Sequence, residues 1–346
     1  MDLSTLNFAP QTLEALSNAG FKNSSDLLGV SIIDLIKKTS LDENEALTVV
    51  HSIRPFHDSS TTFRGISALE LLSTSSPNPV ISFIRDLDNL LDGGFPTGTI
   101  TELIGAPNSG KTQLCLQLTA DVYISSCLGG TQGEAVFIDT EGDFCSNRLQ
   151  QISMAVVEHL VSTVQSNLQS NSQSSDDFDR LMGGISVDSI MQKTIVYRAF
   201  DYLELLAIIY SLSELIQKNS NIKLLIIDSI AAPFKYAFGE DYANRTRILH
   251  ELMTFLRTFA FENNVAVVLT NHLVSKSNQS NDQSINQSVA FAPALGDSFG
   301  QHCSTRLLLS ICEESKRRKI ISIKPNNSQT DDVYFDINNL GVRGST

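Results

Sequence analysis

Gly105-Ala-Pro-Asn-Ser-Gly-Lys-Thr112 is the stretch of this 346-residue chain from which the fold can be worked out. It matches the pattern G-x-x-x-x-G-K-[ST], in which a glycine-rich loop cradles phosphate groups. The glycines permit tight turns that point successive backbone N–H groups at phosphate oxygens. The lysine adds a mobile positive charge for the β and γ phosphates, and the threonine offers a hydroxyl group to Mg²⁺. The expected nucleotide-binding residues are Gly105, Ala106, Pro107, Asn108, Ser109, Gly110, Lys111, Thr112 and Gln113.

The flanks of the loop agree with this interpretation. Residues 99–104 read as a short strand that enters the loop, and residues 112–120 as an amphipathic helix that leaves it. The N-terminal end of such a helix carries a partial positive charge, which favours a bound phosphate. The alternative, a glycine-rich turn that precedes Lys-Thr by chance, does not account for the strand and the helix.

The composition is that of a globular protein. The hydrophobic fraction is 42%, and no apolar run approaches the about 20 residues that span a bilayer. Residues 1–4 lack the basic and apolar regions of a signal peptide, so we expect a cytosolic or nuclear protein without membrane contact. The five cysteines include no C-x-x-C pair, which suits neither a disulfide framework nor a zinc site. The net charge of −13 argues against coating nucleic acid through bulk electrostatics.

Residues 1–55 read as a small all-helical domain. Apolar residues recur at helical spacing in 13–21 and 26–36, and a third helix is predicted for 41–53 with Asp42 as its N-cap. The segment resembles a helix-hairpin-helix domain, but its hairpin has no glycine, and four basic residues stand against seven acidic ones. The sequence therefore favours docking on a protein over binding DNA, and leaves both open.

Residues 56–79 read as a linker rich in Ser, Thr and Pro. A short apolar stretch, Ala68-Leu-Glu-Leu-Leu72, interrupts it. Such a stretch either docks on a neighbouring subunit or packs back on its own domain, and the sequence does not decide between these.

Residues 80–346 read as one large α/β domain. Strand and helix signals alternate, which predicts a mainly parallel sheet with an antiparallel edge near the C-terminus. The polar segment 166–179 is expected to be an extended surface insertion. The predicted strands are 134–139, 194–197, 222–228, 265–270, 305–311, 319–323 and 332–337, and the predicted helices are 146–164, 202–217 and 247–261.

Acidic and polar residues follow three of the predicted strands. Asp228 ends a strongly apolar strand and is expected to hold Mg²⁺ beside Thr112, because functional sites of open parallel sheets gather at the carboxyl ends of the strands. Glu141 follows another strand and is our choice for orienting the attacking water in hydrolysis, with Lys111 as the second catalytic residue. Asp139 is interpreted as a structural acid. Ordinary strand-end turns are the alternative for these acids.

These spacings resemble the RecA-type strand-exchange recombinases, and the similarity extends over nearly the whole chain. Stretches that resemble this family are 90–95, 98–102, 137–142, Phe144, 148–149 and 269–271. Within the eukaryotic branch, further stretches resemble the C-type paralogue of the main recombinase: 105–107, 110–115, 133–142, 293–296 and 298–300. The resemblance implies a RecA-like P-loop NTPase core with a mainly parallel sheet, preceded by a small helical domain.

The resemblance also implies function. It predicts an ATP-binding, DNA-dependent ATPase subunit in homologous recombination and double-strand break repair. Expected partners are other recombinase paralogues, the main strand-exchange recombinase, and single-stranded and branched DNA in the nucleus. By motif position, Arg148 matches a residue that packs on adenine, and His272 stands at the position of the γ-phosphate sensor, with Asn271 beside it as a further expected nucleotide-binding residue. Residues 232–244 and 273–291 match the two DNA-facing loops.

The chain departs from the family pattern in two places. His272 stands where the family usually has Gln, and its reach and protonation differ. The second DNA-facing loop holds one base, Lys276, and one acid, which is a weak electrostatic footprint for DNA. In the first loop Tyr236 and Phe238 either stack on bases or pack in the core. The basic run 316–319 is interpreted as a hairpin turn rather than a nuclear-import signal.

Three functions are therefore compared. The first is an ATPase subunit with slow, DNA-stimulated turnover inside a hetero-oligomer. The second is an assembly scaffold in which ATP is structural, which the acidic balance and His272 favour. The third is a self-sufficient, filament-forming recombinase, which predicts strand exchange by the purified chain alone.

Overall fold

The structure, a computed structural model, divides into two compact units, Met1–Ser75 and Ser76–Thr346. None of the helices in the described part of the chain is long and apolar enough to cross a membrane. The described residues are Leu3, 8–27, 32–39, 41–42, Glu45, Val49 and Leu69 in the first unit, and 78–345 in the second apart from 172–174, 236, 240, 277–289, 313–316 and 326–331.

The first unit contains short helices around a small apolar core, as the sequence predicted. Helix α1 spans Pro10–Asn18, a 3₁₀ turn spans Ser24–Leu27, and α2 spans Ile32–Thr39. Helix α1 ends before Gly20, which adopts φ +89°, a left-handed conformation that favours glycine. The buried residues of this core are Leu3, Leu16, Phe21, Leu27, Leu35, Leu41 and Val49.

The predicted third helix, 41–53, lies mostly outside the described residues. Its start is described: Asp42 Oδ1 accepts from the Glu45 N–H at 2.7 Å, and Glu45 Oε2 accepts from the Asp42 N–H at 3.2 Å. This reciprocal pair is a capping box, which confirms Asp42 as an N-cap. Of the apolar linker stretch only Leu69 is described, with 76% of its surface exposed.

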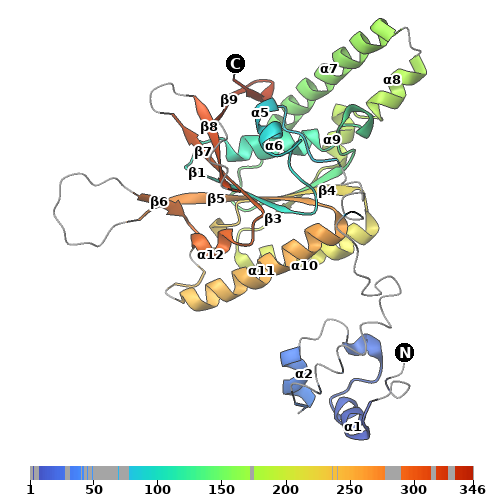
Figure 1. The fold of residues 1–346 in the computed structure, drawn as a ribbon, viewed down its shortest axis with the longest axis vertical. Helices are drawn as coiled ribbons and strands as arrows, with labels where there is room; N and C mark the ends of the chain where they lie inside the picture. The colour runs from blue at the N-terminus through green and yellow to red at the C-terminus, as the bar shows by residue number, and fades with distance from the viewer. Residues whose placement is uncertain are drawn as a thin grey trace, which may run out of the picture. The chain divides into compact units, whose positions relative to one another are not determined.

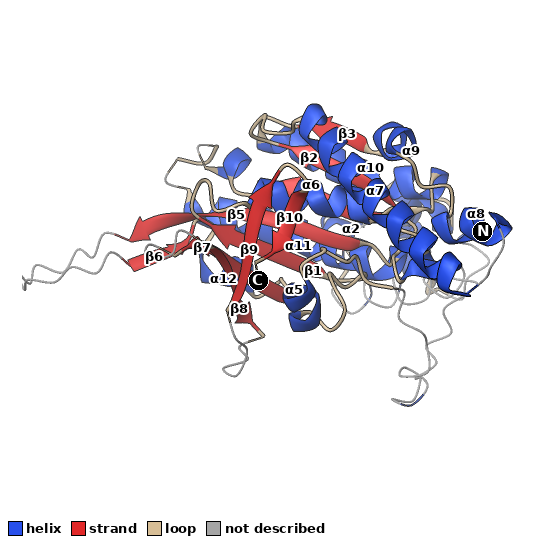
Figure 2. Ribbon diagram, turned by 90° about the horizontal axis from the view of Figure 1, so that it is seen from above, coloured by secondary structure: helices blue, strands red, loops and turns tan. Residues whose placement is uncertain are grey.

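The second unit is built on one large sheet (Figures 1 and 2). The strand order is β10-β9-β8-β7-β1-β5-β4-β2-β3, with β6 paired to the far end of β5. The strands from β3 to β7 in this order run parallel, and β7 to β10 pair antiparallel, which confirms the predicted mixed sheet. The strands are β1 (Ile100–Gly105), β2 (Glu134–Asp139), β3 (Ile195–Arg198), β4 (Ile222–Asp228), β5 (Ala266–Lys276), β6 (Ala290–Pro293), β7 (Thr305–Ile311), β8 (Arg318–Lys324), β9 (Val333–Asn338) and β10 (Gly341–Gly344).

Helices cover both faces of this sheet. Figure 1 shows α6 and α7 on one side and α10 and α11 on the other. Successive residues of β4 face opposite sides: Leu224 and Ile226 join one core, and Leu225 and Ile227 the other. This explains why the strand is a continuous apolar run. The helices are α5 (Arg85–Leu90), α6 (Lys111–Asp121), α7 (Ser146–Asn171), α8 (Ser175–Met182), α9 (Val187–Lys193), α10 (Tyr202–Lys218), α11 (Tyr242–Asn263) and α12 (Gly296–Gly300).

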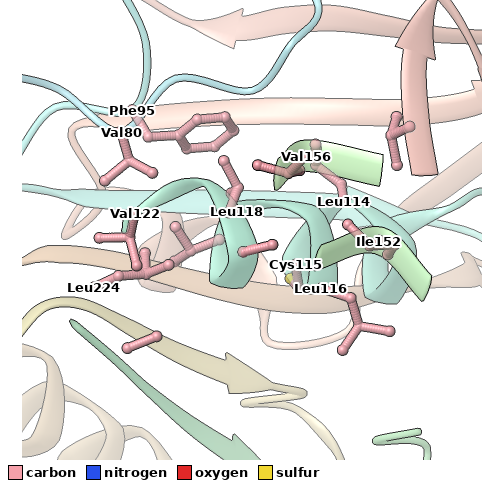
Figure 3. Packing of buried hydrophobic residues seen from close by; sticks show 14 of the residues in the cluster. Val80, Phe95, Leu114, Cys115, Leu116, Leu118, Val122, Ile152, Val156 and Leu224 are labelled. Carbon is pink, nitrogen blue, oxygen red and sulfur yellow. The ribbon is translucent and has the colours of Figure 1, made fainter. Parts of the chain in front are cut away.

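The packing of α6 fixes the loop before it. Leu114 and Leu118 of α6 lie against Ile152 and Val156 of α7 in one fully buried cluster (Figure 3). Because these side chains have no exposed surface, α6 is held rigidly on the sheet and the loop at its N-terminus is positioned with it.

The polar segment 166–179 is not an extended insertion. Helix α7 continues to Asn171, and α8 returns beside it as an antiparallel helix (Figure 1). The segment is helical because a few apolar residues among its many Ser and Gln residues form one apolar face. Leu168, Phe178 and Leu181 pack against the core of the second unit.

Two further boundaries differ from the sequence prediction. Strand β5 does not end at Thr270 but runs to Lys276, because its second half pairs antiparallel with β6. Residues 273–276 and 290–293 are thus a two-stranded ribbon, and 277–289 of the predicted second loop lie outside the described residues. Helix α11 begins at Tyr242 rather than 247, since Asp241 caps its N-terminus.

Candidate active site

The glycine-rich loop joins β1 to α6 and needs glycine at both ends. At Gly105 a Cβ atom would lie 2.5 Å from Ser109 Oγ and 2.6 Å from the Leu309 carbonyl oxygen. Gly110 adopts φ +107°, and a Cβ there would meet the side chains of Ile337 and Phe335 at 3.0 to 3.2 Å. Neither position has room for a side chain: Gly105 packs closely against Ser109 and β7, and Gly110 packs against two side chains of β9.

Lys111 is the buried cation of the loop. Its Nζ donates hydrogen bonds to the Gly105 carbonyl at 2.9 Å and to the Ala106 carbonyl at 3.1 Å. Burial lowers the pKa of Lys111, and the nearby carboxylates of Asp228 and Glu141 oppose that shift. An arriving phosphate would give this ammonium a charged acceptor in place of two neutral carbonyls, which is a stronger hydrogen bond.

Asp228 lies at the carboxyl end of β4, buried beside the loop. Its Oδ1 accepts a hydrogen bond from Thr270 Oγ1 at 2.5 Å, and it also bonds to the Thr112 side chain. Its Oδ2 is buried and has no partner among the described residues. Burial raises the pKa of Asp228. An unpartnered carboxylate oxygen next to a threonine hydroxyl fits a hard divalent cation such as Mg²⁺, which takes oxygen ligands.

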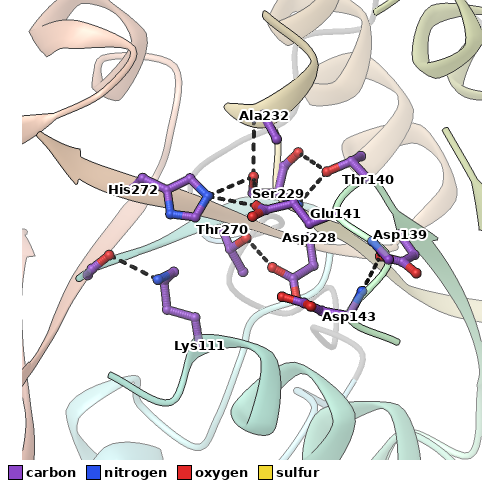
Figure 4. A network of polar contacts seen from close by, with 12 residues as sticks. Lys111, Asp139, Thr140, Glu141, Asp143, Asp228, Ser229, Ala232, Thr270 and His272 are labelled. Carbon is purple, nitrogen blue, oxygen red and sulfur yellow. Dashed lines mark hydrogen bonds and ion pairs between the residues drawn. The ribbon is translucent and has the colours of Figure 1, made fainter. Parts of the chain in front are cut away.

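Glu141 lies on the other side of the site, after β2. Ser229 Oγ donates to its Oε1, and His272 Nε2 lies 2.7 Å from the same oxygen. His272 Nε2 is also 3.2 Å from Ser229 Oγ, so the three side chains form a closed group (Figure 4). The His272 and Ser229 bonds lower the pKa of Glu141 against the opposing effect of burial. Glu141 is thus an ionised carboxylate at neutral pH.

Asp139 is a structural acid, as the sequence indicated. It ends β2 directly opposite Asp228 in the parallel register and is 1% exposed. Its carboxylate accepts backbone N–H bonds from Gly142 at 2.8 Å and Asp143 at 3.1 Å. These bonds shape the turn that carries Glu141 to the site.

One cavity of about 590 Å³ unites most of the predicted residues. It lies over the loop, between the carboxyl ends of the strands and the antiparallel edge. Gly105, Ala106 and Ser109 do not line it: Gly105 and Ser109 are buried beneath the loop, and Ala106 is exposed outside the cavity. The lining residues are Pro107, Asn108, Gly110, Lys111, Thr112, Gln113, Glu141, Asp143, Asp228, His272, Arg318 and Ile337.

The structure does not bring Asn271 to this cavity. The Asn271 side chain is fully buried, and its Nδ2 donates to Glu102 Oε1 at 2.7 Å. Neighbouring residues of a strand face opposite sides, so His272 reaches the site and Asn271 does not. Glu102 also accepts from Arg306 Nε at 2.6 Å, which links β1, β5 and β7.

Arg148 lies beside the cavity rather than in its wall. Its Nε donates to Gln113 Oε1 at 2.8 Å, and its Nη2 donates to the Asn338 carbonyl at 2.6 Å. The guanidinium therefore ties α7 to α6 and to the end of β9. Contact with adenine stays a prediction, and the visible effect of Arg148 is to orient Gln113.

Three lining residues were missed by sequence reasoning. Asp143 comes two residues after Glu141, and the same strand-end argument could have included it. Arg318 belongs to the basic run that was interpreted as a hairpin turn. Strands β7 and β8 pair antiparallel on either side of this run, whose Lys316 lies outside the described residues, and Arg318 opens β8 and reaches the cavity. Its Nε is buried without a partner among the described residues. Ile337 gave no signal beyond strand alternation.

A second cavity, of about 490 Å³, adjoins the first. Pro107, Glu141 and His272 line both, so these residues form the wall between them. The second cavity also contains Lys235 and Arg245 from the predicted first DNA-facing loop and its following helix. The remaining lining residues are apolar or small: Ala231, Ala232, Leu273, Val274, Ala294 and Leu295.

The aromatic residues of the first loop region are only partly described. Phe238 packs on Tyr202, with ring centroids 4.8 Å apart, and lies parallel to Phe234 at 6.1 Å. These contacts favour core packing over base stacking for Phe238. Tyr236 lies outside the described residues.

The chain is similar in sequence to known proteins over most of its length. The model of the Rad51 family matches residues 80–181 and 179–345. A protein called DNA repair protein RAD51 homolog 3, from Cricetulus griseus, is 33% identical over 351 residues, which cover 99% of this chain and 92% of that protein. The protein of that name from Dictyostelium discoideum is 32% identical over 281 residues, 81% of this chain and 69% of its own length. DNA repair and recombination protein RadA from Aeropyrum pernix is 29% identical over 269 residues, 77% of this chain and 75% of its own.

Proposed function

Because the chain belongs to the Rad51 family, we propose that it is an ATP-binding, DNA-dependent ATPase subunit of a recombinase-paralogue complex. The observation that carries this proposal is the convergence of the phosphate-binding loop, Asp228 and Glu141 on one cavity. The family membership confirms the resemblance to RecA-type recombinases, and the two relatives named RAD51 homolog 3 confirm the resemblance to the C-type paralogue. Their names support a role in recombination and DNA repair.

The chemistry is attack of water on the γ-phosphate of ATP. Glu141 orients the water, and its Oε2, which has no hydrogen bond among the described residues, accepts the proton as the oxygen–phosphorus bond forms. The bond from the γ-phosphorus to the bridging oxygen breaks, and ADP and phosphate leave. Lys111 stabilises the charge that develops on the phosphate oxygens. Thr112 and Asp228 would hold Mg²⁺, which would supply neutralisation of the phosphate charge.

The same proposal includes the binding partners of the chain and its localisation in the cell. The chain acts with other recombinase paralogues and with the main strand-exchange recombinase, in the nucleus. Single-stranded and branched DNA are the nucleic acids it meets. The cations of the second cavity, Lys235 and Arg245, support a local contact with a phosphate backbone despite the net charge of −13.

A second candidate function is an assembly scaffold with structural ATP. One observation favours it: Glu141 Oε1 is bonded to both Ser229 and His272, which restrains the residue that would orient water. In this case ATP binding matters and turnover does not.

Complementation of cells that lack the gene tests both candidates, with survival after double-strand breaks as the readout. Lys111→Ala removes the phosphate-binding cation and Glu141→Gln removes the base. The ATPase proposal expects both to fail. Normal repair with Glu141→Gln alone favours the scaffold, and normal repair with Lys111→Ala contradicts both. Lys218→Ala, which removes an exposed cation paired with Glu214, is the matched control.

A further inference from the structure

His272 makes a contact that a phosphate sensor would have to give up. It follows the buried Asn271 on β5, opposite Gly105 of the loop in the parallel register. Its Nε2 lies 2.7 Å from Glu141 Oε1, and both side chains are 30% exposed. Glu141 is a carboxylate and can only accept, so His272 is the donor.

The same nitrogen cannot serve two acceptors on opposite sides. An imidazole nitrogen carries a single proton, so Nε2–H points either at Glu141 or at a phosphate oxygen. Glu141 in turn receives two hydrogen bonds on Oε1, from Ser229 and His272. A carboxylate that is held by two donors is a weaker base and has less freedom to approach a water molecule.

His272 lies between two cavities, and a ligand in either one could take its N–H away from Glu141. It lines the nucleotide cavity, where Lys111 is already placed to bind the terminal phosphates. It also lines the second cavity, whose cations are Lys235 and Arg245. The Arg245 guanidinium lies over the Tyr242 ring, 5.6 Å from its centroid. Arg245 Nε is buried there without a partner among the described residues.

We infer that His272 is a positioning residue that latches Glu141, and that a phosphodiester group entering the second cavity takes over the His272 N–H and frees Glu141 for hydrolysis. This inference rests on the proposed ATPase function. Its ligand is the backbone of single-stranded nucleic acid, since the cavity combines two cations with an apolar floor and the latch needs an anionic acceptor. Basal turnover is slow because the base is held, not because ATP binds poorly.

The test measures steady-state ATP hydrolysis by the full chain with Mg²⁺, with and without single-stranded oligo(dT). For His272→Ala we expect the DNA-free kcat to rise about tenfold, as for loss of one hydrogen bond to a charged group, with an unchanged KM. Added oligo(dT) should raise the wild-type kcat toward the same level and leave the variant unaffected. His272→Gln, which keeps an N–H donor of similar reach on a more flexible side chain, should raise kcat less than His272→Ala. His302→Ala, a histidine change away from both cavities, is the control and should match wild type.

The response to oligo(dT) separates the latch from a merely structural effect, because only a latch makes the variant insensitive to DNA. A DNA-free kcat of His272→Ala at or below wild type overturns the latch, and so does stimulation of this variant by oligo(dT) as strong as that of wild type. If ATP binds in a Lys111-dependent way but no variant hydrolyses it, the latch is wrong and the nucleotide site stands. If the wild type does not bind ATP, the proposed function fails as well.

Discussion

Glu102→Gln tests the support beneath the phosphate-binding loop. Glu102 on β1 is fully buried, and Arg306 on β7, 12% exposed, donates to it at 2.6 Å. Asn271 on β5 donates to the other carboxylate oxygen at 2.7 Å. The substitution keeps the size of the side chain and removes its charge, so Arg306 is left as a largely buried cation without this counter-ion.

The expected loss in the free energy of unfolding is about 3–5 kcal/mol, the cost of breaking a buried ion pair by removing one partner. This is a large part of the about 5–15 kcal/mol that stabilises an ordinary protein. Glu214→Gln is the matched control, because the Glu214–Lys218 pair has the same 2.6 Å distance but side chains that are 70% and 72% exposed. Loss of that pair should cost about 0.5 kcal/mol or less.

Urea unfolding of the full chain, followed by circular dichroism, measures both losses. Adding Arg306→Met to Glu102→Gln should recover part of the stability, because the uncompensated cation is then removed. If Glu102→Gln costs no more than Glu214→Gln, the reasoning from burial is refuted.

Two further predictions concern the cavity wall and the core. Arg318→Ala should weaken ATP binding about tenfold in calorimetry, since its buried Nε, which has no partner in the described part of the chain, can bond a nucleotide oxygen; unchanged affinity would remove Arg318 from the site. Asp88 is bonded to Ser82, and burial raises its pKa to about 6 from 3.8. The stability that protonated Asp88 contributes is fully present below pH 3.8 and is lost as pH rises through 6. In urea titrations, the free energy of unfolding of Asp88→Asn relative to wild type should therefore increase from about pH 4 to about pH 7. A difference that stays constant with pH would contradict the raised pKa.

The main parts of the site could be predicted because each follows from local sequence. The loop has its own motif, and Asp228 and Glu141 each follow an apolar strand whose carboxyl end must meet the others in a parallel sheet. The parallel register that sets Asp139 opposite Asp228 and Gly105 opposite His272 produces this convergence.

The remainder depends on contacts between distant segments. Asn271 and His272 are adjacent on β5, and it is Asn271 that turns away from the site, where it bonds to the buried Glu102. Arg318 reaches the cavity because the antiparallel strands after β7 fold back along the loop, which a basic run in the sequence does not reveal. The bond between His272 and Glu141 joins residues 131 positions apart and carries no sequence signal.

Equilibrium binding of ATP to the full chain in the presence of Mg²⁺ tests the central claim most directly. Wild type and Glu141→Gln should bind ATP at one saturable site that requires Mg²⁺, and Lys111→Ala should not bind. Binding by Lys111→Ala with the affinity of wild type would contradict the assignment of the loop between β1 and α6 as the ATP site.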